Sequence, residues 1–278
     1  MTALPDPECR TIINAYKNKK AKNYSPSSWL AKDPMYRRSG SSFDLKSIRE
    51  YQSFDDPRAI DWKLFARSGK AFVKEFYDEG SEGAAFLLDA SASMKSHSYS
   101  HAFISSLAYI LLGLGTALDV WAFSGGRLGT RLCLRGMASH AGFAKAVQEM
   151  VYGGKTDVNR AFAMLRAQCK LKRIFVFSDF HEQDFMPLLP RSGKLFLVRF
   201  YRPFAELAKD SSEVEVTDPE SGKAIVLPWD KKTRNELDTR EAEKAFALSG
   251  KQGLYYFVMG EGQKRLPFYW KIMDSFYE

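Results

Sequence analysis

The feature that most constrains the fold is a short apolar run at residues 84–88, which follows Gly83 and ends at Asp89. A run that is apolar at every position is typical of a strand buried on both faces of a parallel sheet. Such a strand needs helices packed on both sides, which favours an α/β fold. Open α/β sheets bind ligands beyond the carboxyl ends of their strands, so Asp89 lies where a site is expected.

Further strands and amphipathic helices alternate along the rest of the chain. We expect strands at residues 119–124, 130–134, 172–180, 194–200 and 253–259, and helices at residues 101–118, 139–150, 157–169 and 234–249. An inserted hairpin is expected near residues 212–228. This order predicts a doubly wound, mostly parallel sheet in a main domain at residues 81–278.

Two segments precede this domain. Residues 1–45 are predicted to be a basic arm with partial disorder, which includes a short amphipathic helix at residues 7–20. Residues 46–80 interleave charged and aromatic side chains and contain an alternating strand pattern at residues 71–77. We expect this second segment to form a small β-containing extension of the main domain.

The amino-acid composition limits the cellular compartments in which the protein is expected. The cysteines, Cys9, Cys133 and Cys169, are odd in number and widely spaced, which fits a reducing compartment and disfavours a zinc site. No apolar stretch approaches the length that spans a bilayer, and the start lacks the pattern of a secretory signal. We therefore expect a cytoplasmic protein whose membrane association is at most peripheral.

The formal net charge of +8 is compatible with a nucleic acid, an anionic membrane surface or an acidic protein as partner. Much of the excess lies at residues 17–38, with few aromatic side chains between the basic ones. That pattern is usually a solvated face, so we expect no nucleic-acid binding. The alternative, an arm that binds nucleic acid, predicts an affinity that falls steeply with salt.

Oxygen-bearing side chains follow the strand at residues 84–89 on a single turn: Asp89, Ser91 and Ser93. A carboxylate and hydroxyls are hard donors of the kind that Mg²⁺ accepts while it keeps several waters. Serine and aspartate are also preferred at helix N-termini, so the alternative is that Ser91 and Ser93 cap the helix that follows. These residues alone leave both interpretations open.

Two more oxygen donors come from later loops. Thr156 follows Gly153 and Gly154, which predict a flexible turn that brings its hydroxyl towards another loop. The Gly-Lys-Thr run there is not a phosphate loop, because Glu149 stands where that motif requires glycine. Asp179 ends another apolar strand, and it emerges beside Asp89 if the two strands are parallel neighbours.

In this order, Asp89-x-Ser91-x-Ser93, Thr156 and Asp179 resemble the metal-ion-dependent adhesion site of the von Willebrand factor A domain. An upstream pattern resembles the signature of the bacterial family called domain of unknown function 58, and it comprises Arg49, Glu50, Tyr51, Asp55, Asp56, Arg58, Ile60, Asp61, Trp62, Ala66 and Arg67. Members of that family carry an A-type domain and are often encoded beside MoxR-type AAA+ ATPases. The resemblance covers about residues 45–260, with a departure at Phe54, where the family usually has glycine.

The resemblance implies a von Willebrand factor A-like domain with Ser91 and Ser93 as direct ligands of a magnesium, manganese or calcium ion. By the same resemblance, Thr156 binds directly or through water, and Asp89 and Asp179 bind mainly through water. It also implies a non-enzymatic protein–protein interaction module in which a carboxylate of a protein ligand completes the coordination. The expected role is adaptor or co-factor of a MoxR-type AAA+ ATPase in protein assembly or maturation.

The alternative from another class is a Mg²⁺-dependent phosphohydrolase of the haloacid dehalogenase type. Asp89 would be its nucleophile, and Ser178, Asp179 and Asp184 would match a later motif of such enzymes. Those enzymes place a second aspartate shortly after the nucleophile as general acid. Ser91 stands there instead and cannot serve that role near neutral pH, so we expect a binding module without catalytic residues.

Overall fold

The computed structural model describes residues 5–22, 39–51, 60–77, 83–180, 193–202, 212–237, 239 and 253–277. The chain forms two compact units. The smaller unit comprises Asn18–Gly83. The larger unit, which we call the main body, comprises Met1–Lys17 and Ala84–Glu278.

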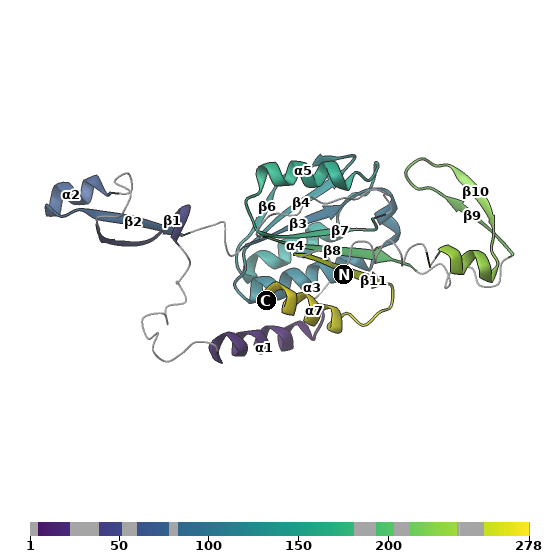
Figure 1. The fold of residues 1–278 in the computed structure, drawn as a ribbon, viewed down its shortest axis with the longest axis horizontal. Coiled ribbons are helices and arrows are strands. Elements are labelled where there is room, and N and C mark those ends of the chain that lie inside the picture. The colour runs from purple at the N-terminus through teal and green to yellow at the C-terminus, as the bar shows by residue number, and fades with distance from the viewer. Residues whose placement is uncertain are drawn as a thin grey trace. The chain divides into compact units, whose positions relative to one another are not determined.

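The main body is organised around a mostly parallel sheet (Figure 1). Strands β11, β8, β7, β3 and β4 are parallel neighbours in that order, and the short strands β5 and β6 pair antiparallel with β4. Their bounds are β3 Ala84–Asp89, β4 Leu118–Ser124, β5 Arg127–Leu128, β6 Leu132–Leu134, β7 Arg173–Ser178, β8 Lys194–Tyr201 and β11 Leu254–Gly260. The prediction of a mixed α/β protein with a mostly parallel sheet is confirmed.

Helices cover both faces of this sheet (Figure 1). The first half of α1 (Cys9–Lys22), α3 (Ser100–Gly113), α4 (His140–Gln148) and α7 (Leu266–Tyr277) lie on one face, and α5 (Val158–Gln168) lies on the other. Alternate side chains of β3 belong to two cores, with Phe86 and Leu88 in one and Ala85 and Leu87 in the other. Burial on both faces explains why the run at residues 84–88 is apolar at every position. Within the described ranges, none of the helices has the length and apolar character needed to cross a membrane.

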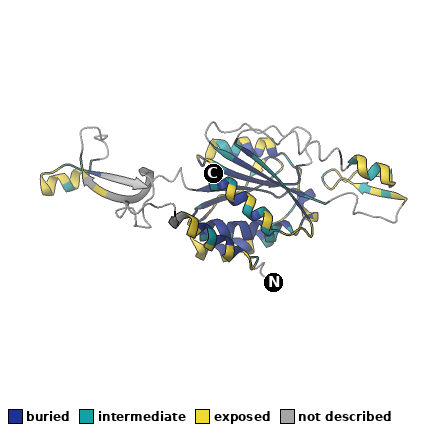
Figure 2. Ribbon diagram, turned by 60° about the horizontal axis from the view of Figure 1, so that its bottom comes forward, coloured by how far each residue is buried: buried dark blue, intermediate teal, exposed yellow. Residues whose placement is uncertain are grey.

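The N-terminal helix α1 is part of the core of the main body (Figure 2). Cys9 and Ile12 are fully buried, and the Tyr16 hydroxyl donates to Asp274 of α7 at 2.5 Å. The amphipathic helix predicted at residues 7–20 is confirmed. The sequence assigned this helix to a basic arm, whereas its apolar face packs against α3 and α7. Residues 23–38 lie outside the described part of the chain.

The smaller unit is built on an antiparallel pair of strands, β1 (Ser39–Glu50) and β2 (Phe72–Tyr77), and β2 matches the strand predicted at residues 71–77. Helix α2 (Trp62–Ser68) precedes β2. Asp61 caps this helix, because its Oδ1 accepts the main-chain N–H groups of Lys63 and Leu64. One residue of the upstream pattern therefore has a local structural role, while residues 52–59 lie outside the described ranges.

The predicted hairpin is formed by β9 (Glu213–Thr217) and β10 (Ala224–Pro228), which pair antiparallel. At the base of the hairpin, buried Trp229 donates its main-chain N–H to the Ser212 carbonyl at 2.7 Å. Residues 231–237 are helical, and most of the helix predicted at residues 234–249 lies outside the described residues.

The packing of α1 predicts a clear difference between two alanine substitutions in that helix. Ile12→Ala removes a fully buried side chain and should lower the free energy of unfolding by about 2–4 kcal/mol. Lys17→Ala, at an exposed position of the same helix, should change it by less than about 0.5 kcal/mol. Chemical denaturation of the full chain measures both values, and equal small effects would show that α1 does not belong to the core.

Candidate functional site

The first part of the candidate site is the edge where β3 and β7 end. The two strands are parallel neighbours with Leu88 opposite Phe177, so Asp89 and Asp179 emerge at the same edge, as expected. The Ser178 hydroxyl donates to Asp89 Oδ2 at 2.6 Å, and both aspartates are buried. Two carboxyl groups are therefore held near each other and away from bulk water.

The second part is the serine loop, residues 90–93, which follows β3. The Ser91 N–H donates to Asp89 Oδ1 at 2.8 Å, and the hydroxyl oxygens of Ser91 and Ser93 lie 3.0 Å apart. The 3₁₀ turn that begins at Ser93 and the helix α3 have Ala92 and Tyr99 as N-caps, in both cases without a side-chain capping bond. The interpretation that the two serines merely cap the following helix is therefore wrong.

The third part is the glycine loop, residues 153–156, which is bonded to the serine loop through main-chain groups. The Gly153 N–H donates to the Ala90 carbonyl at 2.9 Å, and the Ala92 N–H donates to the Gly154 carbonyl at 3.1 Å. The glycine loop and the serine loop therefore lie against each other, and the relative position of the loops is set by the backbone.

Thr156, at the end of the glycine loop, contacts the inserted hairpin. Its main-chain N–H and its hydroxyl both donate to Glu220 Oε1, at 2.7 and 2.6 Å. The cap of α5 is Asp157, whose Oδ1 accepts the Arg160 N–H at 2.9 Å. The contact with Glu220 could not be predicted from the sequence, because no motif or spacing links Glu220 to a residue 64 positions away.

One pair of these oxygens has a spacing that is compatible with a small divalent cation. In an octahedral site with ligands at about 2.0–2.1 Å from Mg²⁺, neighbouring ligand oxygens are roughly 2.9 Å apart. The hydroxyl oxygens of Ser91 and Ser93 lie 3.0 Å apart, which matches that spacing. Within the part of the chain that the structure describes, no group of three or more His, Cys, Asp or Glu side chains is arranged to hold a metal, so the candidate set depends on hydroxyls.

The electrostatics of this edge also favour a cation. Removal from water raises the pKa of Asp89 to about 7; the charge of Asp179 acts in the same direction, and the hydrogen bond from Ser178 acts in the opposite one. Ionised Asp89 is thus unfavourable in the metal-free protein. A positive ion beside the two carboxylates would offset that penalty.

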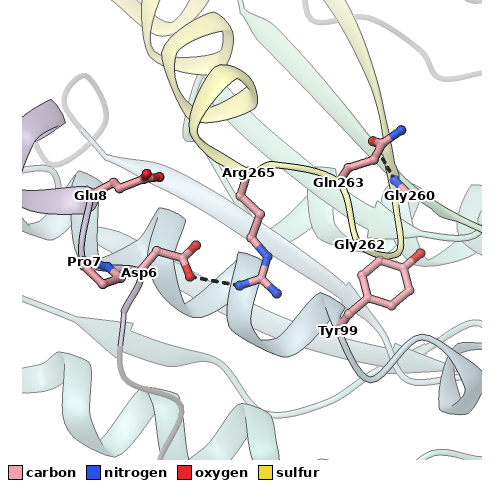
Figure 3. A pocket seen from close by; sticks show the side chains of 8 residues that line it. All are labelled: Asp6, Pro7, Glu8, Tyr99, Gly260, Gly262, Gln263 and Arg265. Carbon is pink, nitrogen blue, oxygen red and sulfur yellow. Dashed lines mark hydrogen bonds and ion pairs between the residues drawn. The ribbon is translucent and has the colours of Figure 1, made fainter.

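A separate pocket of about 310 Å³ lies beside the end of β11 (Figure 3). Within it, Arg265 donates to Asp6 Oδ1 at 3.0 Å, and the Gly260 N–H donates to Gln263 Oε1 at 3.0 Å. Arg265 and Asp6 therefore compensate each other's charge, and Glu8 is the other charged residue in the lining. None of the site residues predicted from the sequence lines this pocket.

The chain belongs to the family described as Protein of unknown function DUF58, which matches residues 47–246. No curated protein matches the chain. This assignment confirms the family resemblance carried by the pattern upstream of the sheet.

Several solved structures are similar to this chain at low identity. The conserved hypothetical protein BatB from Bacteroides thetaiotaomicron has 12% identity and a TM-score of 0.41, covering 72% of this chain and 100% of that one. An aerotolerance-related membrane protein from Bacteroides fragilis NCTC 9343 has 13% identity and a TM-score of 0.39, covering 71% and 98%. A von Willebrand factor type A protein from Catenulispora acidiphila has 16% identity and a TM-score of 0.31, covering 46% and 34%. These likenesses are too distant to support an argument about function.

The burial of Asp89 predicts how the stability of the metal-free protein depends on pH. Its pKa is about 7 in the native state and about 3.8 for an ordinary aspartate. Asp89 is therefore protonated in both the native and the unfolded state below about pH 4. Between about pH 4 and pH 7 it ionises in the unfolded state first, so the free energy of unfolding falls until the pH has passed 7. Relative to Asp89→Asn, which does not titrate, the wild type should lose a few kcal/mol, at most about 4, between pH 4 and pH 8. Denaturation in a chelator at several pH values measures this, and a constant difference would contradict it.

The glycine loop offers a matched pair of substitutions. Gly154 has a φ of +75°, and a side-chain carbon there would lie 2.5 Å from Ser124 Oγ, whereas a carbon added at Gly153 meets nothing within 4 Å. Gly154→Ala should therefore lower the free energy of unfolding by about 1–3 kcal/mol, and Gly153→Ala by less than about 1 kcal/mol. Urea denaturation compares the two variants, and equal losses would show that the close approach at Gly154 is not required.

Proposed function

We propose that this protein is a divalent-metal-dependent protein interaction module with a doubly wound domain of the von Willebrand factor A type. In this proposal a magnesium, manganese or calcium ion is held by Asp89, Ser91, Ser93, Thr156 and Asp179. The observation that carries it is the meeting of the serine loop and the glycine loop at the edge where β3 and β7 end. There the hydroxyl oxygens of Ser91 and Ser93 are 3.0 Å apart and Asp89 and Asp179 are buried. A bound cation would supply the positive charge that an acidic ligand needs.

The residues divide into two kinds of donor in this proposal. Ser91 and Ser93 contribute hydroxyl oxygens directly, and Thr156 contributes directly or through water. Asp89 and Asp179 balance the charge of the ion and hold its waters. Few direct protein ligands leave an exchangeable coordination position, which a carboxylate of another protein can fill.

The proposed partner is a MoxR-type AAA+ ATPase, a protein that such an ATPase acts on, or both, in cytoplasmic protein assembly or maturation. Its support is the family resemblance, which associates this kind of chain with such ATPases. The basic residues near the start are assigned no nucleic-acid role. The proposed module recognises acidic side chains through its metal and performs no chemistry on them.

The phosphohydrolase alternative is less well supported by the surroundings of Asp89. Both of its carboxyl oxygens accept hydrogen bonds, from Ser91 N–H and from the Ser178 hydroxyl, which reduces their capacity to attack a phosphorus atom. The position of the general acid is occupied by Ser91. Asp184, the last residue of the later motif, lies outside the described residues.

Metal binding is the direct test of the proposed site. Titration calorimetry with Mn²⁺ and Mg²⁺ should show one site in the wild type, and Asp89→Ala and Ser93→Ala should weaken it by at least about tenfold. Ser98→Ala removes an exposed serine a few residues further along and should leave the affinity unchanged. Equal affinities for all four proteins would contradict the assignment.

The same variants test the partner in a pull-down from the native cell. Wild type should capture partners that are lost with Asp89→Ala and on addition of a chelator, because the partner's carboxylate needs the ion. An unchanged partner list in both cases would exclude the adhesion mechanism. If the wild type hydrolyses a generic phosphoester in Mg²⁺ and Asp89→Asn abolishes this activity, the phosphohydrolase alternative would be supported instead of the adhesion mechanism.

A further inference from the structure

The tip of the inserted hairpin is bonded to the glycine loop through the side chain of Glu220. At residues 217–226, all of which the structure describes, only Glu220 is half-buried and the others are exposed. Glu220 Oε1 accepts two hydrogen bonds from Thr156, one from the main-chain N–H at 2.7 Å and one from the hydroxyl at 2.6 Å. The contact is therefore specific, and it is made to a residue of the proposed metal site.

The turn of the hairpin is built to present this carboxylate. Asp218 organises the turn, because its Oδ1 accepts the Glu220 N–H at 2.9 Å and its Oδ2 accepts the Ser221 hydroxyl. The Gly222 N–H donates to the Asp218 carbonyl at 2.8 Å, with Gly222 at a φ of +68° that favours glycine. Asp218 is thus used within the turn, whereas the carboxylate of Glu220 is directed to Thr156.

We propose that Glu220 is an in-chain ligand of the adhesion site, which occupies the position that a partner's carboxylate takes. This inference rests on the proposed function. Its geometric basis is the distance of 2.6 Å between Thr156 Oγ1 and Glu220 Oε1. This distance is that of a hydrogen bond, and the two oxygens would have to separate only slightly, to roughly 2.9 Å, to become neighbouring ligands of one octahedral cation.

A partner of this site must present a carboxylate on an exposed turn, as the hairpin does, and must displace Glu220 to bind. The site is therefore closed by its own chain until an acidic ligand that binds the ion more tightly than Glu220 is present.

The hairpin is suited to such displacement. A lone two-stranded hairpin is of marginal stability in water. Its strand β10 exposes the apolar side chains of Ile225 at 57% and Val226 at 63%, whereas Val214 and Val216 of β9 are half-buried (Figure 2). The tip is held by a polar contact and the base by Trp229, which is 2% exposed. Release of the tip therefore exposes few apolar groups.

Substitution by glutamine distinguishes a metal ligand from a residue that only holds the hairpin by hydrogen bonds. Glu220→Gln keeps an oxygen that can accept both hydrogen bonds from Thr156 but removes the charge. Metal affinity should be unchanged if Glu220 only accepts hydrogen bonds, and it should fall if Glu220 is a ligand of the cation. Glu215→Gln is the matched control, since Glu215 is an exposed glutamate in the middle of β9.

The measurement is Mn²⁺ binding, monitored through the relaxation rate of water protons. Glu220→Gln should bind Mn²⁺ more weakly, on the order of tenfold, and should give a higher relaxation enhancement per bound ion, because water replaces the carboxylate. Glu215→Gln should match the wild type in both. If Glu220→Gln also matches the wild type while Asp89→Ala loses the metal, this inference fails and the proposed function stands. If Asp89→Ala and wild type bind Mn²⁺ equally, both fail.

Discussion

The organisation of this protein depends on holding two carboxyl groups, Asp89 and Asp179, inside the main body at the ends of adjacent parallel strands. Buried charge is costly unless it is hydrogen-bonded or paired. Ser91 and Ser178 supply hydrogen bonds to the carboxylate of Asp89. Arg199, itself 2% exposed, donates from Nε to the main-chain carbonyl of Asp179 at 2.9 Å and so holds the backbone at this edge. The loops around this edge meet the same requirement with main-chain groups and hydroxyls, and a cation would complete the compensation.

The candidate site therefore combines a rigid platform with an exchangeable contact. The serine loop and the glycine loop are joined by main-chain hydrogen bonds, and β3 beneath them is buried at every residue. The tip of the hairpin, in contrast, is bonded to this platform through the side chain of Glu220. The proposed binding function would need this division, because the ligand positions must be fixed while the ligand itself must exchange.

The sequence predicted most strands and helices of the main body, but it misplaced one boundary for a physical reason. The apolar residues Leu114 and Leu118 continue the helical spacing of residues 101–118, yet α3 ends at Gly113. Gly115 has a φ of +84°, and the Thr116 N–H donates to the Leu111 carbonyl at 2.9 Å, which closes the helix. Leu118 is then the first residue of β4 and is buried in the sheet, so its apolar side chain belongs to a strand and not to the helix.

The sequence by itself determined the parallel α/β core and the family, since an apolar run, a turn and the residues that follow a strand are encoded within a few positions of one another. For the same reason it proposed the oxygen donors of the candidate site. Only the tertiary structure decided that Ser91 and Ser93 do not cap a helix, that α1 completes the core, and that Glu220 lies on Thr156. These features depend on contacts between segments far apart in the chain, whose formation is governed by how complete surfaces pack. Local patterns of polarity carry no record of such contacts.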